Sequence, residues 1–508
     1  MNRKQRRATG ATPPSQGIDD KSRALIAEAQ ACDSRGDFAQ AARLYAELTR
    51  RLPASWVAFH NLGVALKELG RLDEAVAAYE RAVALGGTAQ THSNLGVALA
   101  ELERIEPARA AHARAAAMQP DSAAVQANLG AFHFLTRDLE RAEAALRHAI
   151  RLEPDAVDAH VKLGAVLFES GRPAEAATCL RHAVALAPRH AEAHSFLSMA
   201  LLAQGDLPSG FAEYEWRRAH LGFPRMNPAI PEWRGGMLTG RTILLYGEQG
   251  LGDVLQFARY VSVAAAVGGR VVLQAHRPLV RLLRSVPGVA EVVEEGQPLP
   301  HFDCHLPLMS VPLVVGTRLD TIPANIPYLR PDPAEVADWA ERLRGVEGLR
   351  VGLVWSGNPR PHDRDANLVD RRRSLPLAAL APLASRTGVT FVSLQKGAAA
   401  AEARTPPAGM VLVDQTDAIG DFAHTAALVA NLDLVISVDT SVAHLAGAMG
   451  KPVWVLSRFD ACWRWLGNRT DSPWYPSARV FGQPRPGDWS SVTAQVAEAL
   501  KTVTPAGG

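Results

Sequence analysis

The first half of the chain repeats itself, and this repeat constrains the fold more than any other feature. A Leu-Gly pair recurs with its glycine at four positions: Gly63, Gly96, Gly130 and Gly164. These glycines are 33, 34 and 34 residues apart, and alanine follows each of them by twelve and again by nineteen residues. Small residues at fixed places let paired helices lie close together, and a proline closes three of the units. The pattern therefore predicts a stack of helix pairs.

This pattern resembles the tetratricopeptide repeat, with about six units between residues 22 and 219. The resemblance implies a superhelix whose concave face binds a protein or peptide. Asparagine precedes three of the Leu-Gly pairs, at Asn61, Asn94 and Asn128. Asparagine can donate to and accept from a peptide backbone, and the column resembles the asparagine ladder of protein O-linked N-acetylglucosamine transferases. The alternative is that these residues are merely solvated.

After residue 219 the pattern changes to alternating strands and helices. The proline-containing residues 220–240 are typical of a linker. Short apolar runs predict strands at residues 242–246, 270–274, 289–294, 303–306, 349–355, 389–394, 410–413, 432–438 and 453–456. This alternation predicts two parallel sheets, in residues 241–335 and 336–508, with ligands at their carboxyl ends. We expect the final helix, residues 492–503, to cross back to the first sheet.

Residues 438–452 combine a strand end with a short helix. Asp439, Thr440 and Ser441 follow the strand, where a helix would begin and where such side chains cap free N–H groups. The first N–H groups of a helix and its positive dipole end can bind a phosphate or diphosphate. His444 lies one turn beyond Thr440 and would face the same ligand. The alternative is an ordinary strand–helix unit with a satisfied histidine.

A glycine-rich turn follows the first strand of the α/β segment. Gly247, Gly250 and Gly252 permit a tight turn into a helix that starts near Asp253. Their Gly-x-x-Gly-x-Gly order differs from the nicotinamide fingerprint, and no Walker lysine follows. The sequence therefore argues against a dehydrogenase.

Together these motifs resemble the heptosyltransferase family (glycosyltransferase family 9), which has the GT-B fold and uses nucleotide-diphosphate sugars. The resemblance is carried by Gly250-Leu-Gly-Asp-Val254, Asp439-Thr-Ser-Val-Ala-His444 and Gly450-Lys-Pro452. It implies that Asp253, beside Gly252, is a general base for the acceptor hydroxyl. It also implies that Asp439, Thr440, Ser441 and His444 hold the diphosphate without a metal ion. The alternative for Asp253 is that it only caps its helix.

The resemblance also places donor contacts in two further loops. Ser356 and Gly357 follow the strand at 349–355, and Arg373 stands where the family has a phosphate-binding lysine. The alternative for the arginines near 373 is a solvated charge run. Gln395 and Lys396 end the next strand, where the family's acidic residue for the ribose has no match. This departure, and the long loop before Arg373, leave the donor nucleotide and sugar open.

Composition sets further limits. The net charge of +2 provides no broad field for nucleic acid, and no run approaches the ~20 apolar residues of a membrane span. Residues 1–21 are expected to form a disordered basic tail rather than a secretory signal. Four widely spaced cysteines favour a reducing cytoplasm. The group from His301 to His305 fits one strand with alternating faces better than a metal site.

The sequence therefore predicts a multidomain chain, an all-α tetratricopeptide superhelix followed by an α/β GT-B module of two Rossmann-like halves. We expect a cytoplasmic glycosyltransferase with no cofactor besides its nucleotide-diphosphate sugar, and with a glycan or protein acceptor recruited by the repeats. Two alternatives stay open: a scaffold that has lost catalysis, and a protein O-glycosyltransferase.

Overall fold

The computed structural model describes residues 19–223, 226, 229–460, 462–467 and 469–504. The chain divides into two compact units, of which one holds residues up to 167 together with residues 175–193. The other unit holds residues 168–174 and the chain from residue 194 on. The predicted tail, residues 1–21, falls mostly outside the described residues, and helix α2 begins at Asp20.

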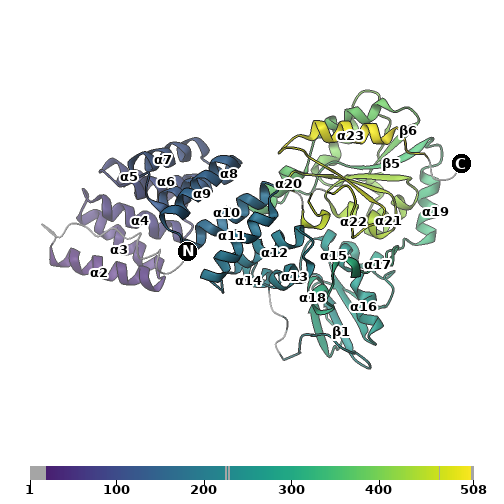
Figure 1. Cartoon of the computed structure of the whole chain (residues 1–508), viewed down its shortest axis with the longest axis horizontal. Helices are drawn as coiled ribbons and strands as arrows, with labels where there is room; N and C mark the ends of the chain where they lie inside the picture. Colours follow the sequence, from purple (N-terminus) through teal and green to yellow (C-terminus); the bar gives the residue numbers. More distant parts are fainter. Residues whose placement is uncertain (1–18, 224–225, 227–228, 461, 468, 505–508) are drawn as a thin grey trace. The chain divides into compact units, whose positions relative to one another are not determined.

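The first unit is a stack of paired helices (Figure 1). Its helices are α2 (Asp20–Arg35), α3 (Phe38–Arg51), α4 (Trp56–Glu68), α5 (Leu72–Ala84), α6 (Ala89–Glu101), α7 (Ile105–Met118), α8 (Ala123–Leu135), α9 (Leu139–Leu152), α10 (Val157–Glu169) and α11 (Pro173–Leu186). Five of them begin where a side-chain oxygen accepts the N–H three residues on, at Asp19, Asp37, Ser55, Ser122 and Asp138. Such caps explain where these helices start.

The recurrent glycines are explained by a side chain that lies sixteen residues further on. A Cβ added at Gly164 would lie 2.7 Å from Cδ2 of Leu180, which is fully buried. At Gly63 it would meet the ring of Tyr79 at 2.6 Å, and at Gly96 the ring of His112 at 2.7 Å. Each helix pair therefore closes only because the first helix has no side chain at that point.

The second unit contains most of α12 (Ala191–Ala203), followed by α13 (Leu207–Tyr214), α14 (Arg217–His220) and two parallel sheets. The first sheet has the order β3-β2-β1-β4. Its strands are β1 (Thr242–Tyr246), β2 (Arg270–Ala275), β3 (Val289–Glu294) and β4 (Cys304–Pro307). Its accompanying helices are α15 (Leu251–Phe257), α16 (Tyr260–Ala266), α17 (Val280–Leu283) and α18 (Val311–Val314).

The second sheet has six strands in the order β10-β9-β8-β5-β6-β7. They are β5 (Leu349–Val354), β6 (Val389–Ser393), β7 (Leu412–Val413), β8 (Leu434–Val438), β9 (Val453–Ser457) and β10 (Ala478–Gly482). Its helices are α19 (Pro333–Arg342), α20 (Arg364–Arg373), α21 (Phe422–Ala430), α22 (Ser441–Ala448) and α23 (Trp489–Leu500).

Helices cover both faces of this sheet (Figure 1). Val435 of β8 packs in the cluster that contains α21 and α22. Leu434 and Ile436, on either side of it in the strand, pack in the cluster that contains α23. Alternate residues of β8 are thus buried on opposite faces, which explains its continuous apolar run. The expectation that the last helix crosses to the first sheet is wrong, because α23 packs against β10 and the 3₁₀ segment Leu377–Ser385.

The predicted fold class, helical repeats followed by an α/β module, is confirmed by this order of elements. The predicted domain limits stay predictions.

Candidate functional site

Each sheet carries one of the predicted motifs where its strand order reverses. In the first sheet β1 lies between β2 and β4, and the glycine loop, residues 247–250, follows β1. In the second sheet β5 lies between β8 and β6. The loop after β5 carries Ser356 and Gly357, and the loop after β8 carries Asp439 and Thr440. Ligands of open α/β sheets bind at such points, beyond the carboxyl ends of the strands.

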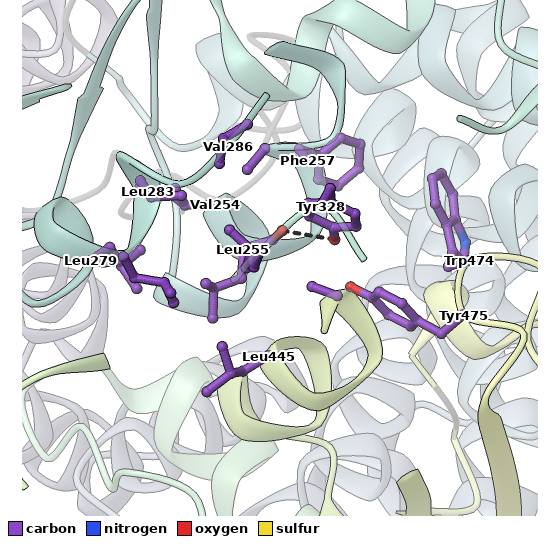
Figure 2. Close-up of a cluster of buried hydrophobic side chains, with 14 of the residues drawn as sticks. Val254, Leu255, Phe257, Leu279, Leu283, Val286, Tyr328, Leu445, Trp474 and Tyr475 are labelled. Atoms are coloured by element: carbon purple, nitrogen blue, oxygen red, sulfur yellow. Dashed lines mark hydrogen bonds between the residues drawn. The ribbon is translucent and has the colours of Figure 1, made fainter. Parts of the chain in front are cut away.

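The structure brings the two motifs together, because α15 of the first half packs on α22 of the second half. A Cβ added at Gly252 would lie 2.9 Å from Cδ2 of His444 and 3.4 Å from Cα of Ser441. Figure 2 shows Leu255 of α15 and Leu445 of α22 in one buried cluster, where Tyr328 donates a hydrogen bond to the Leu255 carbonyl at 3.0 Å. Glycine at position 252 therefore permits the close approach of the two helices.

The first turn of α22 offers N–H groups to a ligand. Thr440 is the N-cap, yet its hydroxyl lies 3.0 Å from the Ser437 hydroxyl and caps no N–H group. Within the described part of the chain, the N–H groups of Ser441 and Val442 have no hydrogen-bond partner. These two donors and the helix dipole favour an anion at this end.

His444 and Asp439 are packed beside this turn. His444 is 5% exposed, stacks on Trp465 with ring centroids 5.2 Å apart, and has Nδ1 3.0 Å from the Tyr475 hydroxyl. Burial lowers the pKa of His444 to about 4, although Asp439 opposes this shift. Burial alone would raise the pKa of Asp439, but His444 and Arg373 hold it below its ordinary value. At neutral pH the pair therefore consists of a neutral imidazole and a carboxylate.

Both carboxylate oxygens of Asp253 already accept a donor. Oδ2 accepts the N–H of Gly250 at 3.0 Å, and Oδ1 forms an ion pair with Arg464. Burial alone would lower the pKa of Arg464, but the Asp253 carboxylate raises it. The side chain of Asp253 is 20% exposed. The capping role is thus present in the structure, and the catalytic role stays a prediction.

The other predicted donor residues lie near the α22 turn or support it. Arg373 donates to the Asp439 carbonyl at 3.1 Å and to Asp370 at 2.8 Å. Ser356 Oγ lies 3.3 Å from the hydroxyl of Ser374. A Cβ at Gly357 would lie 2.5 Å from the guanidinium of Arg373, so this glycine gives the arginine room.

Gln395 and Lys396 make bonds within the protein. The Gln395 amide accepts the N–H groups of Trp355 and Ser356, at 3.0 and 2.9 Å, and donates to the Ser356 carbonyl at 3.0 Å. Lys396 Nζ donates to the carbonyls of Thr416 and Ile419, at 2.8 and 3.2 Å. Gln395 therefore shapes the loop after β5, and direct donor contact by either residue stays a prediction.

Sequence reasoning missed three groups at this junction. Arg464 pairs with Asp253, and Tyr475 contacts His444. Arg259 is 2% exposed and donates to the carbonyls of Trp474 and Pro323, at 2.9 and 3.3 Å. Arg464 and Tyr475 lie in the aromatic run from Trp463 to Tyr475, for which the sequence offers two interpretations, a segment that stacks on the donor or closes the cleft, and plain packing.

The predicted asparagine column has partners inside the repeats. Asn61 is 4% exposed, and Asn94 Oδ1 accepts from Gln90 Nε2 at 2.8 Å. Asn128 Nδ2 donates to the Ser93 hydroxyl of the preceding unit at 2.9 Å. Peptide binding by these residues stays a prediction.

Among the described residues, no group of three or more His, Cys, Asp or Glu side chains is arranged to hold a metal ion. In the same part of the chain, no helix combines the length and the apolar character needed to cross a membrane.

Comparisons with known proteins agree with these two parts. Residues 26–89 and 133–200 match tetratricopeptide repeat models, and residues 387–458 match glycosyltransferase family 9 (heptosyltransferase). The tetratricopeptide matches thus lie in the first half of the chain, and the family 9 match lies in the second α/β half. This confirms the predicted resemblance, and the family 9 match supports a glycosyltransferase in general.

Protein FlbA of Caulobacter vibrioides is 30% identical over 326 residues, 59% of this chain and 53% of FlbA. The chain therefore spans about half the length of this relative. TTC0263, a thermophilic TPR protein in Thermus thermophilus, is 25% identical over 32% of this chain and 91% of its own, with a TM-score of 0.30. MamA of Desulfovibrio magneticus RS-1 is 22% identical over 34% of this chain and 99% of its own, also with a TM-score of 0.30.

Proposed function

We propose that this protein transfers a sugar from a nucleotide-diphosphate donor to a glycan or protein acceptor that the repeat region recruits. The observation that carries the proposal is the contact between α15 and α22, in which Gly252 lies against Ser441 and His444. It joins a carboxylate, that of Asp253, to a helix end with free N–H groups. Sugar transfer from a diphosphate uses both: a base for the acceptor and a seat for the leaving group.

In the proposed reaction the donor diphosphate lies at the N–H groups of Ser441 and Val442. Arg373 lies beside the same turn and adds positive charge. The acceptor oxygen attacks the anomeric carbon while the bond between that carbon and the diphosphate breaks. Asp253 takes the acceptor proton, for which the Arg464 ion pair must loosen when the substrates bind. The helix end then stabilises the charge on the leaving group, so the proposal requires no metal ion or other cofactor.

The repeats would supply the acceptor. Tetratricopeptide superhelices bind partners on their concave face. We place the contact at the column of Asn61, Asn94 and Asn128, and we place the reaction in the cytoplasm. Changing the three asparagines to alanine should lower turnover on the acceptor and leave hydrolysis of the donor unchanged. Equal transfer by the variant and the wild type would remove the column from the proposal.

The scaffold alternative is favoured by one observation. Asp253 is engaged by both Gly250 and Arg464, as a residue with a purely structural role would be. A panel of nucleoside diphosphates and their sugars in a thermal-shift assay separates the alternatives. A ligand at a hundred times its dissociation constant stabilises the protein by about 2.7 kcal/mol. Absence of any shift across the panel would favour the scaffold.

Donor hydrolysis tests the base. Asp253→Asn should lower it by about a hundredfold or more, while the thermal shift produced by the donor persists. The matched control is Asp138→Asn, which alters a capping carboxylate in the repeats and should leave hydrolysis unchanged. Equal rates in Asp253→Asn and the wild type would remove the catalytic assignment.

A further inference from the structure

The last helices of the repeat region pack as part of the second unit. Phe211 of α13 is 1% exposed, and its ring meets those of Phe257 and Trp463 edge to face, with centroids 6.3 and 6.0 Å apart. Leu207 is fully buried in the same cluster. These helices therefore share one hydrophobic core with the first sheet and with the aromatic run after β9.

A buried arginine connects α14 to the glycine loop. Arg217 is 1% exposed, and its guanidinium makes five hydrogen bonds. Nε and Nη2 both donate to Oε1 of Glu248, at 3.0 and 2.5 Å, and Nη2 also donates to the Ser310 hydroxyl at 2.8 Å. Nη1 donates to the Tyr214 carbonyl at 3.1 Å and to Glu215 at 2.8 Å. All five guanidinium N–H groups are thus used, which holds the group in one orientation.

The same helices hold the next residue of the loop. The Tyr214 hydroxyl donates to Oε1 of Gln249 at 3.1 Å, and the guanidinium of Arg217 lies 4.7 Å from the centre of the Tyr214 ring. Glu248 and Gln249 precede Gly250, whose N–H binds the Asp253 carboxylate. The end of α13 and the start of α14 are therefore linked to Asp253 through three consecutive loop residues.

Burying the ion pair between Arg217 and Glu248 costs desolvation free energy that a purely structural contact would not require. The Glu248 side chain is 7% exposed, and burial raises its pKa although Arg217 opposes the shift. Its second oxygen, Oε2, has no hydrogen-bond partner among the described residues. Buried ion pairs are often replaced by apolar residues without loss of stability, whereas their directional bonds restrict geometry.

We propose that α13 and α14 hold the glycine loop in the geometry that sugar transfer requires, with Arg217 as the positioning residue. This inference rests on the proposed function, because it assigns to Arg217 an effect on the reaction of Asp253. Arg217 acts through Glu248 and Gly250 and touches neither substrate. The repeat region would thus contribute a residue that positions the glycine loop, in addition to a surface that binds the acceptor.

Arg217→Met tests the inference, with Arg218→Met as the matched control. Arg218 lies next to it on α14, and it pairs with Glu232 at 2.5 Å and with Glu215 at 3.8 Å, neither of which belongs to the glycine loop. We expect Arg217→Met to lower kcat for donor hydrolysis at least tenfold, with the donor KM within twofold, because the α22 turn is not altered. Arg218→Met should stay within twofold of the wild type in both. An unchanged kcat in Arg217→Met would overturn the inference.

A second variant separates positioning from stability. Arg217→Met combined with Glu248→Gln removes the orphaned carboxylate, so it should recover thermal stability without recovering kcat. Recovery of both would show that Arg217 acts only on stability and would overturn the inference. If Arg217→Met does not fold, Tyr214→Phe removes a single loop contact and should lower kcat severalfold; an unchanged kcat would again count against the inference.

Hydrogen exchange distinguishes failure of this inference from failure of the proposed function. Arg217→Met should speed amide exchange in residues 247–253 of the full chain, and Arg218→Met should not. Equal exchange in Arg217→Met and the wild type overturns the inference, whatever the activity. Faster exchange in a protein whose wild type turns over no donor would instead reject the proposed function.

Discussion

Gly252→Ala tests the junction on which the site depends. The added Cβ would lie 2.9 Å from Cδ2 of His444 and 3.4 Å from Cα of Ser441. Carbon atoms that are not bonded prefer about 3.5–4.0 Å, so the two helices must separate by roughly 0.5–1 Å. His444 has little room to yield, because its ring packs against both Trp465 and Tyr475 and it is 5% exposed.

The expected penalty follows from these distances. Overpacking a tight contact costs about 1–3 kcal/mol, and replacing glycine by alanine in a helix returns up to about 1 kcal/mol. We therefore expect the free energy of unfolding of the second unit to fall by about 1–2 kcal/mol. A displacement of about 1 Å between reacting groups can lower a rate by about a hundredfold, so activity should suffer more than stability.

The assay measures release of nucleoside diphosphate from the donor, together with the thermal midpoint. Gly482→Ala is the matched control, since a Cβ there has no heavy atom within 4 Å, and it should change neither quantity. If Gly252→Ala keeps both the wild-type rate and the wild-type midpoint, α15 and α22 do not pack as described, and the shared site is refuted.

Three further substitutions test the packing inside each unit, two in the first unit and one in the second. Burial lowers the pKa of His112 to about 4, so between pH 4 and pH 6.5 the unfolded chain binds a proton that the native chain does not. The free energy of unfolding therefore decreases as the pH is lowered through this range, by up to about 1.4 kcal/mol per pH unit. His112→Leu should flatten this slope in urea unfolding; an unchanged slope would contradict the assignment. Gly164→Ala should destabilise the repeats by about 1–3 kcal/mol by circular dichroism, because Leu180 is already in contact, and a neutral effect would refute the role given to this glycine. Arg259→Met leaves the carbonyls of Trp474 and Pro323 without their donor and should cost the second unit about 3 kcal/mol in a tryptophan-fluorescence unfolding curve; wild-type stability would show these bonds to be dispensable.

Elements with a strong local pattern could be predicted from the sequence. The strands β1 and β3 have the predicted bounds, because each is a short segment rich in β-branched or leucine residues next to a glycine turn. Strand β10 was missed because Val480 and Phe481 are its only large apolar residues, and its pairing depends on the edge that β9 offers. Helix α20 was missed because the polar segment before Arg373 has no apolar period.

The motifs of the site were found for a similar reason, and their partners were not. Gly252 and His444 stand in local patterns of strand, turn and helix, so their place at the strand ends followed from the sequence. The pairing of Arg464 with Asp253 joins residues from different halves of the module. This pairing depends on how the two halves pack together, and a local sequence pattern does not contain that information. The close approach at Gly63 and its equivalents was predicted from the sequence, but the side chains that fill the space, such as Tyr79, were not, since they belong to the next helix.

The shared core around Phe211 also has a consequence for recombining this protein. Sequence motifs would suggest exchanging repeat arms at the proline-containing stretch after residue 219, where the helical period ends. Such a splice would strip Phe211 from its aromatic neighbours and Arg217 from Glu248. A hybrid that brings a foreign arm to this chain should instead be joined ahead of α12, so that the host keeps its own last helices.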